Sequence, residues 1–308
     1  MRVMTITTAT GKHYPTPICA CIGYFDGVHR GHQKLIEETI QMAKEKQCES
    51  ALITFDPDPW VTVRGDTDVK HICTMRQRMN LAVHLGIQNI IILKFTKDMS
   101  ELSPKKFVEN ILGRLELKGL VCGFDFHYGH LGRGSGKSLQ KTAPYDVKIV
   151  SEVKDAGGKI SSTRISEALV NGKIEQVNDM LGYCYYMEGT VVHGLRQGTQ
   201  MGFPTANVRY SDEYILPKLG VYAGFAVVGK SRYKAMINIG HNPTVAYTKK
   251  PSLEVHLLGY KGDLYERMIA VEFVSYLREE RTFKNRSNLA MQMNQDMRDI
   301  KKILADYE

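Results

Sequence analysis

Two histidines, an aspartate and three glycines lie together in the segment GYFDGVHRGH, residues 23–32. The imidazoles of His29 and His32 can donate hydrogen bonds to phosphate oxygens, and Gly27 and Gly31 permit a close approach of the backbone. The H-x-G-H spacing places the second imidazole in the first turn of a helix, beside the first. These residues predict a phosphate-binding turn. For a single histidine, a side chain satisfied in the core or at the surface would be the better interpretation.

The elements around this segment must place it where a ligand can reach it. It follows an apolar run and precedes an amphipathic stretch, so a strand is expected before it and a helix after it. In an open α/β sheet, ligands bind beyond the carboxyl ends of strands, where helix N-termini offer unpaired N–H groups to phosphate. Neither the GxGxxG fingerprint nor the P-loop pattern occurs here, which argues against those two modes of nucleotide binding.

A second set of phosphate-binding candidates precedes another expected helix, in the sequence KISSTRISEAL. The hydroxyl and guanidinium groups belong to Ser161, Ser162, Thr163 and Arg164. At a helix N-terminus such groups can bind a triphosphate, because a guanidinium forms charge-assisted hydrogen bonds to phosphate. Taken alone, the segment is better explained as a helix cap with a capping box that includes Glu167.

A long glycine-rich loop, residues 123–137, follows a further strand candidate. Loops of this kind clasp a ligand or remain mobile. Asp125 in this loop and Asp26 in the first segment are candidates for ligand contact, but each could simply cap a loop. Asp125 is favoured over an arbitrary aspartate because it sits at a strand end within the loop.

The first part of the chain alternates apolar runs with helical patterns. The strand candidates are PICACIGYF, SALITF, NIIILKF, LVCGF and DVKIVSEV. Between them, Ile36, Ile40 and Ala43 have helical spacing, and Phe107, Ile111 and Leu115 predict another helix. Apolar strands that alternate with helices indicate a parallel sheet covered on both faces. We therefore expect a doubly wound, Rossmann-like α/β domain.

After Leu181 the pattern changes to closely spaced strands broken by Gly, Asn and Pro. They are EGTVVHG, GVYAGFAVV, YKAMINIG, LEVHLLGY and MIAVEFVSYL. Helical spacing returns over residues 287–304. This pattern predicts a small antiparallel barrel or sandwich closed by a C-terminal helix. The boundary is expected near MLGYCYY, which divides the chain into domains 1–183 and 184–308.

Length and charge are compatible with this division. The chain has 308 residues, enough for two cores, and a net charge of +8. Lys and Arg are interleaved with Glu, as in EETIQMAKEK, and no stripe of basic and aromatic residues emerges. A basic surface suits small phosphorylated anions, and nucleic acid is the less favoured partner. Oligomeric state is left open.

The cysteines and the N-terminal sequence suggest a reducing compartment. The six cysteines form no CxxC pair, so neither a zinc site nor a disulfide framework is indicated. The chain starts without an apolar signal core, and no run approaches the roughly 20 apolar residues that span a bilayer. We expect no membrane partner and a location in the cytoplasm.

Several motifs in a fixed order resemble one known family. GYFDGVHRGH, GFDFHYGHLGRG and ISSTRI resemble the adenylyltransferase module of bacterial bifunctional riboflavin kinase/FMN adenylyltransferases. GTVVHGLRQGTQMGFPTANV is similar to the family's flavokinase signature, which ends in PTAN. INIGHNPTV, LEVHLLGYKGDLY and LREERTF then follow in family order. The resemblance covers nearly the whole chain and implies a nucleotidyltransferase domain followed by a flavokinase-like barrel.

For the first module, the resemblance implies transfer of AMP from ATP to FMN, which gives FAD and pyrophosphate. Such a transfer needs no protein nucleophile, because positioning and electrostatic stabilisation supply most of the catalysis. His29, His32 and Arg164 are the implied catalytic residues. The implied ATP and phosphate ligands are Gly23, Phe25, Asp26, Gly27, Gly31, Ser161, Ser162 and Thr163, and Asp125, Phe126 and Tyr128 would contact the flavin.

For the second module, the resemblance implies phosphorylation of riboflavin by ATP. Glu254 would be the base for the neutral ribityl hydroxyl, and strand alternation places it on one face with His256 and Leu258. A carboxylate that points into a small barrel would be costly without a partner or a task. Thr205 and Asn207 would bind Mg²⁺ and ATP phosphates, with Gly194 and Gly202 also at the nucleotide and Arg278 at the flavin. Without the resemblance, PTAN would be interpreted as a tight turn.

The chain departs from the family pattern at several positions. These are Tyr24, Asp58, Ser166, Thr199, Gly259 and Glu266. The loss of a charged contact to a transferring phosphate could cost about 2–4 kcal/mol. The leading hypothesis is a bifunctional enzyme that makes FMN and then FAD. The alternatives are an FMN adenylyltransferase whose kinase domain only binds flavin, and a flavin-sensing regulator that binds RNA or protein.

Overall fold

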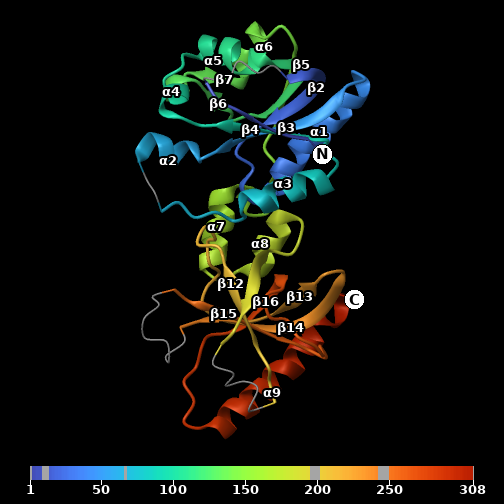
Figure 1. Ribbon diagram of the computed structural model, residues 1–308, viewed down its shortest axis with the longest axis vertical. Helices are drawn as coiled ribbons and strands as arrows, with labels where there is room; N and C mark the ends of the chain where they lie inside the picture. Colours follow the sequence, from blue (N-terminus) through green and yellow to red (C-terminus); the bar gives the residue numbers. More distant parts are fainter. Residues whose placement is uncertain (1, 9–13, 66–67, 195–201, 242–249, 308) are drawn as a thin grey trace. The chain divides into compact units, whose positions relative to one another are not determined.

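The computed structural model describes residues 2–8, 14–65, 68–194, 202–241 and 250–307 (Figure 1). The contacts within the chain divide it into two compact units, Met1–Ser162 and Thr163–Glu308. Each unit is described by itself below.

The first unit is built on a six-stranded parallel sheet with the strand order β1-β4-β3-β2-β5-β8. The strands are β1 (Arg2–Ile6), β2 (Tyr14–Ile22), β3 (Glu49–Asp56), β4 (Asn89–Lys94), β5 (Leu115–Gly123) and β8 (Asp146–Val150). The central strands are apolar on both faces. Leu52 packs with the α1 side and Ile53 with the opposite side, and both are fully buried. The expected doubly wound α/β domain is confirmed.

Helices cover both faces of this sheet. They are α1 (Arg30–Glu45), α2 (Pro59–Arg64), α3 (Met75–His84), α4 (Lys97–Ser100), α5 (Pro104–Asn110) and α6 (Gly136–Thr142). Ile36 of α1 and Ala82 of α3 belong to one core cluster, whereas Phe107 of α5 and Leu139 of α6 belong to the other. Short 3-10 turns η1 (Asp26–Val28), η2 (Leu112–Arg114) and η3 (His130–Gly132) and the pair β9 (Lys154–Asp155) and β10 (Gly158–Lys159) complete the unit.

One expectation for this unit was wrong. Helix α5 ends at Asn110, and Leu115 begins β5 instead of continuing a helix. Ile111 and Leu112 are both fully buried, so the apolar spacing there reflects a buried turn that leads into a strand. The glycine-rich residues 123–137 also contain a hairpin, in which β6 (His127–Tyr128) pairs with β7 (Gly134–Ser135).

The second unit is a closed antiparallel barrel preceded by two helices, α7 (Ser162–Val170) and α8 (Ile174–Leu181). The barrel strands are β11 (Tyr186–Val192), β12 (Ala206–Tyr210), β13 (Gly220–Val228), β14 (Ser231–Gly240), β15 (Ser252–Leu257) and β16 (Met268–Arg278). Helix α9 (Arg286–Ile303) continues into η5 (Leu304–Tyr307) and packs Ile300 against Phe225 and Met236. The predicted barrel with a terminal helix is confirmed.

Helix α8 is attached to the barrel by the side chain of Asn178. Its Nδ2 donates a hydrogen bond to the carbonyl of Phe273 on β16, and its Oδ1 accepts one from the backbone N–H of Tyr185. Gly182 caps the helix with a φ of 77°. Among the described residues, no helix is both long and apolar enough to cross a membrane.

Candidate functional site

The turn between β2 and α1 is buried and strained. Phe25, Gly27 and Val28 have φ angles of 61°, 74° and 39°, which lie in the left-handed region that non-glycine residues rarely adopt. A Cβ atom at Gly27 would lie 3.0 Å from Ile72, so both conformation and space favour glycine there. The side chains of Phe25 and Val28 are fully buried in the core. Only the backbone of Phe25 is therefore left for the phosphate contact predicted for it.

His29 and His32 meet as their spacing predicts. His29 is the N-cap of α1, and its Nδ1 accepts a hydrogen bond of 3.4 Å from the backbone N–H of His32. The two rings stack with centroids 3.7 Å apart and an interplanar angle of 16°. A Cβ atom on Gly31 would lie 3.1 Å from the His29 ring, so this glycine admits the imidazole. Because Nδ1 is the acceptor, neutral His29 carries its proton on Nε2.

Burial sets the protonation state of both rings. It lowers the pKa of His29, which is 6% exposed, to about 4. The pKa of His32 lies well below its usual value, first because its ring is enclosed and then because the charges of His29 and Arg78 oppose protonation. His32 keeps some accessible surface, but its Nδ1 is buried and finds no hydrogen-bond partner among the described residues. At neutral pH both rings are uncharged and act as N–H donors.

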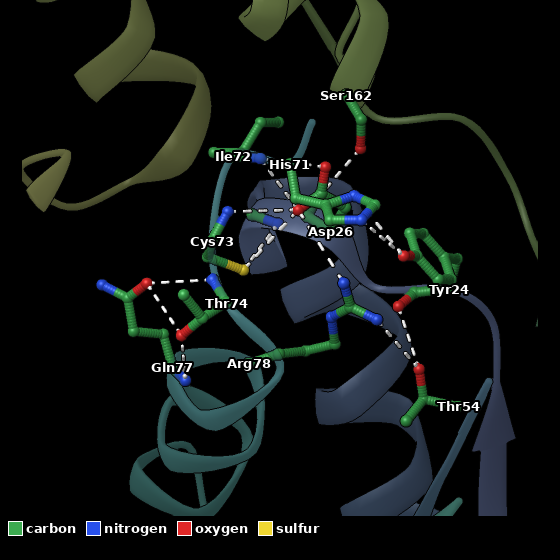
Figure 2. Close-up of polar contacts among 11 residues, drawn as sticks. Tyr24, Asp26, Thr54, His71, Ile72, Cys73, Thr74, Gln77, Arg78 and Ser162 are labelled. Atoms are coloured by element: carbon green, nitrogen blue, oxygen red, sulfur yellow. Dashed lines mark hydrogen bonds and ion pairs between the residues drawn. The ribbon is translucent and has the colours of Figure 1, made fainter. Parts of the chain in front are cut away.

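Asp26 faces inward and organises the turn (Figure 2). Its carboxylate is 7% exposed and accepts hydrogen bonds from the backbone N–H groups of Ile72, at 3.1 Å, and Cys73, at 3.2 Å. Arg78 Nη2 lies 3.9 Å from Oδ1 of the same carboxylate. The backbone carbonyl of Asp26 accepts a hydrogen bond of 3.0 Å from Ser162 Oγ. These contacts match the loop-capping alternative, and contact of Asp26 with phosphate stays a prediction.

Arg78 is a residue of this site that the sequence analysis missed. It lies on α3, is 1% exposed, and its guanidinium carbon stacks 4.1 Å from the centroid of the Tyr24 ring. Tyr24, one of the departures from the family pattern, also places its hydroxyl 3.4 Å from the His71 ring. Its position in the sequence could have indicated that it is buried, because Arg78 shares a helix face with the buried Ala82 four residues later.

The candidates for flavin contact in this unit follow β5. Asp125 is exposed and pairs with Lys159, whose Nζ lies 2.5 Å from Oδ2 and 4.6 Å from the centroid of the Phe124 ring. Phe126 is half-buried and stacks on Tyr128 at 5.7 Å. Tyr128 is 7% exposed and belongs to the core, so its ring offers little surface to a ligand.

The KISSTRISEAL segment forms the expected helix, but α7 begins at Ser162, three residues earlier than predicted. Ser162, Thr163 and Arg164 therefore occupy its first turn, and Ser161 precedes them. Ser161 and Ser162 are half-buried residues of the first unit. Thr163 and Arg164 belong to the second unit, and their action together with His29 stays a prediction.

A separate cluster in the barrel gathers the residues implied for phosphorylation. Asn207 on β12 is the direct partner of Glu254 on β15. A Cβ atom at Gly194 would lie 2.0 Å from Asn207 Nδ2, so only glycine leaves room for this side chain. Burial, followed by the negative charge of Glu280, raises the pKa of Glu254, although hydrogen bonds to Ser252 and Thr205 lower it in part. Gly202 adopts a φ of 83° in the turn before PTAN.

Glu254 lies on the outer face of the barrel, contrary to the expectation of an inward-pointing carboxylate. Its neighbour Val255 is fully buried opposite Ile237, and residues next to each other on a strand point to opposite faces. His256 shares the outer face with Glu254, and its Nδ1 lies 2.8 Å from the carbonyl of Pro204. Leu258 falls outside β15, so it does not continue the alternation.

Arg278 is engaged by α9. Its Nε and Nη2 donate to the carboxylate of Asp296 at 3.0 and 2.6 Å, and its Nη1 donates to the carbonyl of Glu279. Gln292 Nε2 donates to the same carboxylate at 2.8 Å. The ion pair has a structural role, and a flavin contact by Arg278 stays a prediction.

The remaining departures from the family pattern lie at helix starts and turns. The Asp58 carboxylate caps α2 by accepting the N–H of Trp60 at 2.6 Å. Gly259 and Glu266 have φ angles of 77° and 60°. Ser166 is half-buried on α7. Thr199 lies outside the described residues.

Comparison with known proteins gives two domain matches. The family described as FAD synthetase matches residues 12–164, and the family described as riboflavin kinase matches residues 181–304. The matches fall on the parallel sheet unit and on the barrel. Helix α8 lies in the sequence between the two matches and reaches the second only at Leu181.

Relatives named "Bifunctional riboflavin kinase/FMN adenylyltransferase" align along almost the whole chain. The protein from Listeria monocytogenes is 37% identical over 93% of this chain and 92% of its own length. That from Bacillus subtilis is 38% identical over 89% of each chain. A solved structure from Streptococcus pneumoniae, titled as a macrolide-efflux protein, is 26% identical over 98% of this chain and 99% of its own, with a TM-score of 0.91.

Proposed function

The chain belongs to the bifunctional riboflavin kinase/FMN adenylyltransferase family, and we propose that it phosphorylates riboflavin to FMN and then adenylylates FMN to FAD. The observation that carries this proposal is the pairing of each matched domain with its own polar cluster. The stacked histidines begin α1 in the first unit, and Glu254 faces Asn207 in the second. The substrates are accordingly ATP, riboflavin and FMN.

In the adenylyl transfer, a phosphate oxygen of FMN attacks the α-phosphorus of ATP. The bond from that phosphorus to the bridging oxygen breaks, and pyrophosphate leaves. Because Nδ1 of His29 accepts the capping hydrogen bond, its Nε2–H is the group that donates to a phosphate oxygen of ATP. His32 supports the His29 ring by stacking on it. The uncharged rings stabilise the developing charge by hydrogen bonding, because burial disfavours their protonation.

The other residues of the first site hold the phosphates. Gly23, Phe25, Gly27 and Gly31 contribute backbone next to the N-terminus of α1, where the first N–H groups of a helix have no intrahelical carbonyl as partner. Ser161, Ser162, Thr163 and Arg164 bind the departing pyrophosphate. Asp125, Phe126 and Tyr128 border the flavin. Asp26 contributes through the loops that its carboxylate and carbonyl hold.

In the phosphorylation, the ribityl hydroxyl of riboflavin attacks the γ-phosphorus of ATP, and ADP leaves. Glu254 accepts the hydroxyl proton, and its raised pKa makes it a stronger base than an exposed carboxylate. The donor set suits Mg²⁺, because Thr205 and Asn207 offer hydroxyl and amide oxygens beside this carboxylate. Mg²⁺ supplies charge neutralisation on the phosphates when bound, while Gly194, Gly202 and Arg278 border the substrates.

The other candidate functions are separated by assay. A monofunctional FMN adenylyltransferase is favoured only by the departures at Thr199, Gly259 and Glu266, whereas the Thr205, Asn207 and Glu254 cluster is intact. An RNA-binding regulator is not favoured, because the sequence contains no stripe of basic and aromatic residues. We further propose that the enzyme works in the cytoplasm, where its phosphorylated substrates are retained.

The test supplies purified full-length protein with ATP and MgCl₂ and either riboflavin or FMN, and separates the flavins by chromatography. Formation of FMN and FAD from riboflavin supports the bifunctional enzyme. Formation of FAD from added FMN alone selects the monofunctional enzyme, and flavin binding without turnover selects the regulator. Omission of MgCl₂ should abolish both reactions.

Two variants then assign the sites. Replacement of His29 and His32 by Ala should lower FAD formation by about 10²–10³-fold and leave riboflavin phosphorylation intact. Glu254→Gln should lower FMN formation by about 10²–10⁴-fold and leave adenylylation of FMN intact. Parallel loss of both activities in either variant would argue against separate sites.

A further inference from the structure

The turn that carries His29 needs an outside support. Phe25 and Val28 hold left-handed conformations without being glycine, and such conformations persist only when surrounding structure imposes them. The turn hydrogen-bonds within itself through Val28 N–H and the Phe25 carbonyl, at 3.1 Å. Two further hydrogen bonds reach the turn from outside it, from Gln33 Nε2 to the Val28 carbonyl at 2.9 Å and from the Gly27 N–H to Cys73 Sγ at 3.1 Å. Phe25 itself is flanked by Tyr24 and Asp26.

Arg78 holds both of those side chains (Figure 2). Its guanidinium stacks on Tyr24, which precedes Phe25, and lies 3.9 Å from the carboxylate of Asp26, which follows it. Arg78 Nη1 makes a long hydrogen bond of 3.5 Å to Thr54 Oγ1, and Thr54 Oγ1 donates to the Tyr24 carbonyl at 3.0 Å. One side chain from α3 therefore contacts the turn on both sides of Phe25.

Asp26 also connects the turn to two further segments by hydrogen bonds. Its carboxylate receives the N–H groups of Ile72 and Cys73, which begin the approach to α3, and its carbonyl receives Ser162 Oγ. Ser162 opens the second segment with phosphate-binding candidates. The backbone of Asp26 thus ties Ser162 to the turn of His29 within the first unit.

Stability alone explains the pair poorly. Arg78 is 1% exposed, its closest carboxylate is at 3.9 Å, and its Nε has no hydrogen-bond partner among the described residues. A buried ion pair can often be replaced as a whole by apolar side chains without loss of stability, so its presence is weak evidence for a role in the fold alone. Arg78 also opposes protonation of His32, which keeps that ring a neutral neighbour of His29.

We propose that Arg78 is a positioning residue for adenylyl transfer, which holds Tyr24 and Asp26 so that the His29 turn meets ATP in a single geometry. The inference rests on the proposed function, because adenylyl transfer is the reaction that Arg78 would assist. The same position of the His29 turn is also needed for ATP to bind. A displacement of about 1 Å is enough to lower a rate by about 10²-fold.

The experiment compares Arg78→Met with Arg76→Met in the full-length protein. Arg76 is an exposed arginine on the same helix, so its replacement makes the same change in charge at a solvent-exposed position. For Arg78→Met, kcat for FAD formation from FMN should fall about 10–100-fold, and the Kd for ATP of the first site should rise at least fivefold. Riboflavin phosphorylation should stay as in the parent. Because Arg78→Met leaves the Asp26 carboxylate buried without its cation, the urea midpoint followed by the fluorescence of Trp60 should fall, and rates are compared at a temperature at which each variant is folded. Arg76→Met should change neither kcat nor Kd by more than twofold.

Arg78→Lys separates charge from shape. A lysine keeps the positive charge but not the planar stack on Tyr24, so ATP affinity should recover while kcat stays below that of the parent. An Arg78→Met protein with parental kcat and ATP affinity would overturn the inference. So would a loss of rate that is fully explained by the unfolded fraction of the variant at the assay temperature, because Arg78 would then serve only the fold.

The two hypotheses can fail separately. If the parent protein binds ATP but makes no FAD, the proposed adenylyl transfer is wrong. The Kd for ATP of the Arg78 variants, measured with the Glu254→Gln change to isolate the first site from kinase turnover, still decides whether Arg78 positions the turn.

Discussion

Burial determines what His29 and His32 can do chemically. Both rings are enclosed, and the pKa of His29 lies at about 4. A pair of charged imidazoles would attract a triphosphate strongly, but these rings are neutral donors at physiological pH. The positive potential at the turn must then come from the N-terminus of α1 and from Arg78.

This protonation state predicts a specific dependence of stability on pH. In the unfolded chain His29 has a pKa near 6.5, so between pH 6.5 and 4 the unfolded state binds a proton that the folded state does not. The contribution of neutral His29 to the free energy of unfolding is therefore fully present above pH 6.5 and is lost as the pH drops toward 4. From pH 7 to pH 5 the loss from His29 should be about 2 kcal/mol.

The measurement is urea unfolding at pH 7 and pH 5, followed by fluorescence of Trp60, which lies on α2 of the first unit. His29→Gln keeps an acceptor for the His32 N–H but cannot titrate. It should lose about 2 kcal/mol less than the parent protein over this interval. Equal losses in the two proteins would show that His29 is not held neutral.

Helix α9 depends on one buried ion pair for its attachment to the barrel. Asp296 accepts three contacts from the guanidinium of Arg278 and one from Gln292. The side chains of Asp296 and Arg278 are only 2% and 13% exposed. Apolar packing of Ile300 and Leu304 against β13 supplies the rest of the interface.

Asp296→Ala should lower the free energy of unfolding of the second unit by about 3 kcal/mol, because it leaves the buried charge of Arg278 without its carboxylate. Asp299→Ala on the same helix is the control, since Asp299 contacts the exposed Gln295. Circular dichroism during urea unfolding reports the change, and the Trp60 transition should not move. A loss below 1 kcal/mol would show that apolar packing alone holds α9.

The organisation of the whole chain depends on where α7 and α8 belong. The contacts within the chain place the division after Ser162, whereas the sequence predicted domains that meet between 183 and 184. Ile174, Val177, Met180 and Leu181 of α8 are all buried. Asn178 binds both Phe273 and Tyr185, so α8 completes the barrel unit.

Two fragments test this division. A fragment of residues 163–308 should unfold cooperatively and phosphorylate riboflavin. A fragment of residues 184–308 should do neither, because it exposes the surface of β16 that α8 covers. Both are measured by circular dichroism during heating and by FMN formation. A folded and active 184–308 fragment would instead place the boundary where the sequence predicted it.

Local patterns in the chain were sufficient for much of this description. The apolar runs specified β2, β3, β4, β5 and β8, and the Gly-containing turn before α1 was predicted with His29 and His32 side by side. These features depend on residues that are close in sequence, so spacing and residue type are enough to identify them. Edge strand β1 was missed, because its short sequence is recognisable as a strand only through its pairing with β4.

Other features required partners that are distant in sequence. The 107–115 spacing was equally compatible with a helix and with a buried turn, and packing selected the turn. Glu254 points to the outer face of the barrel because the side chain of the next residue, Val255, points inward opposite Ile237. Asp26 and Arg78 are 52 residues apart, and the burial of their charges follows from the packing of α3 on the turn. Residue types and local spacing thus identify which groups can do the chemistry, while long-range packing determines their charge, their orientation and their support.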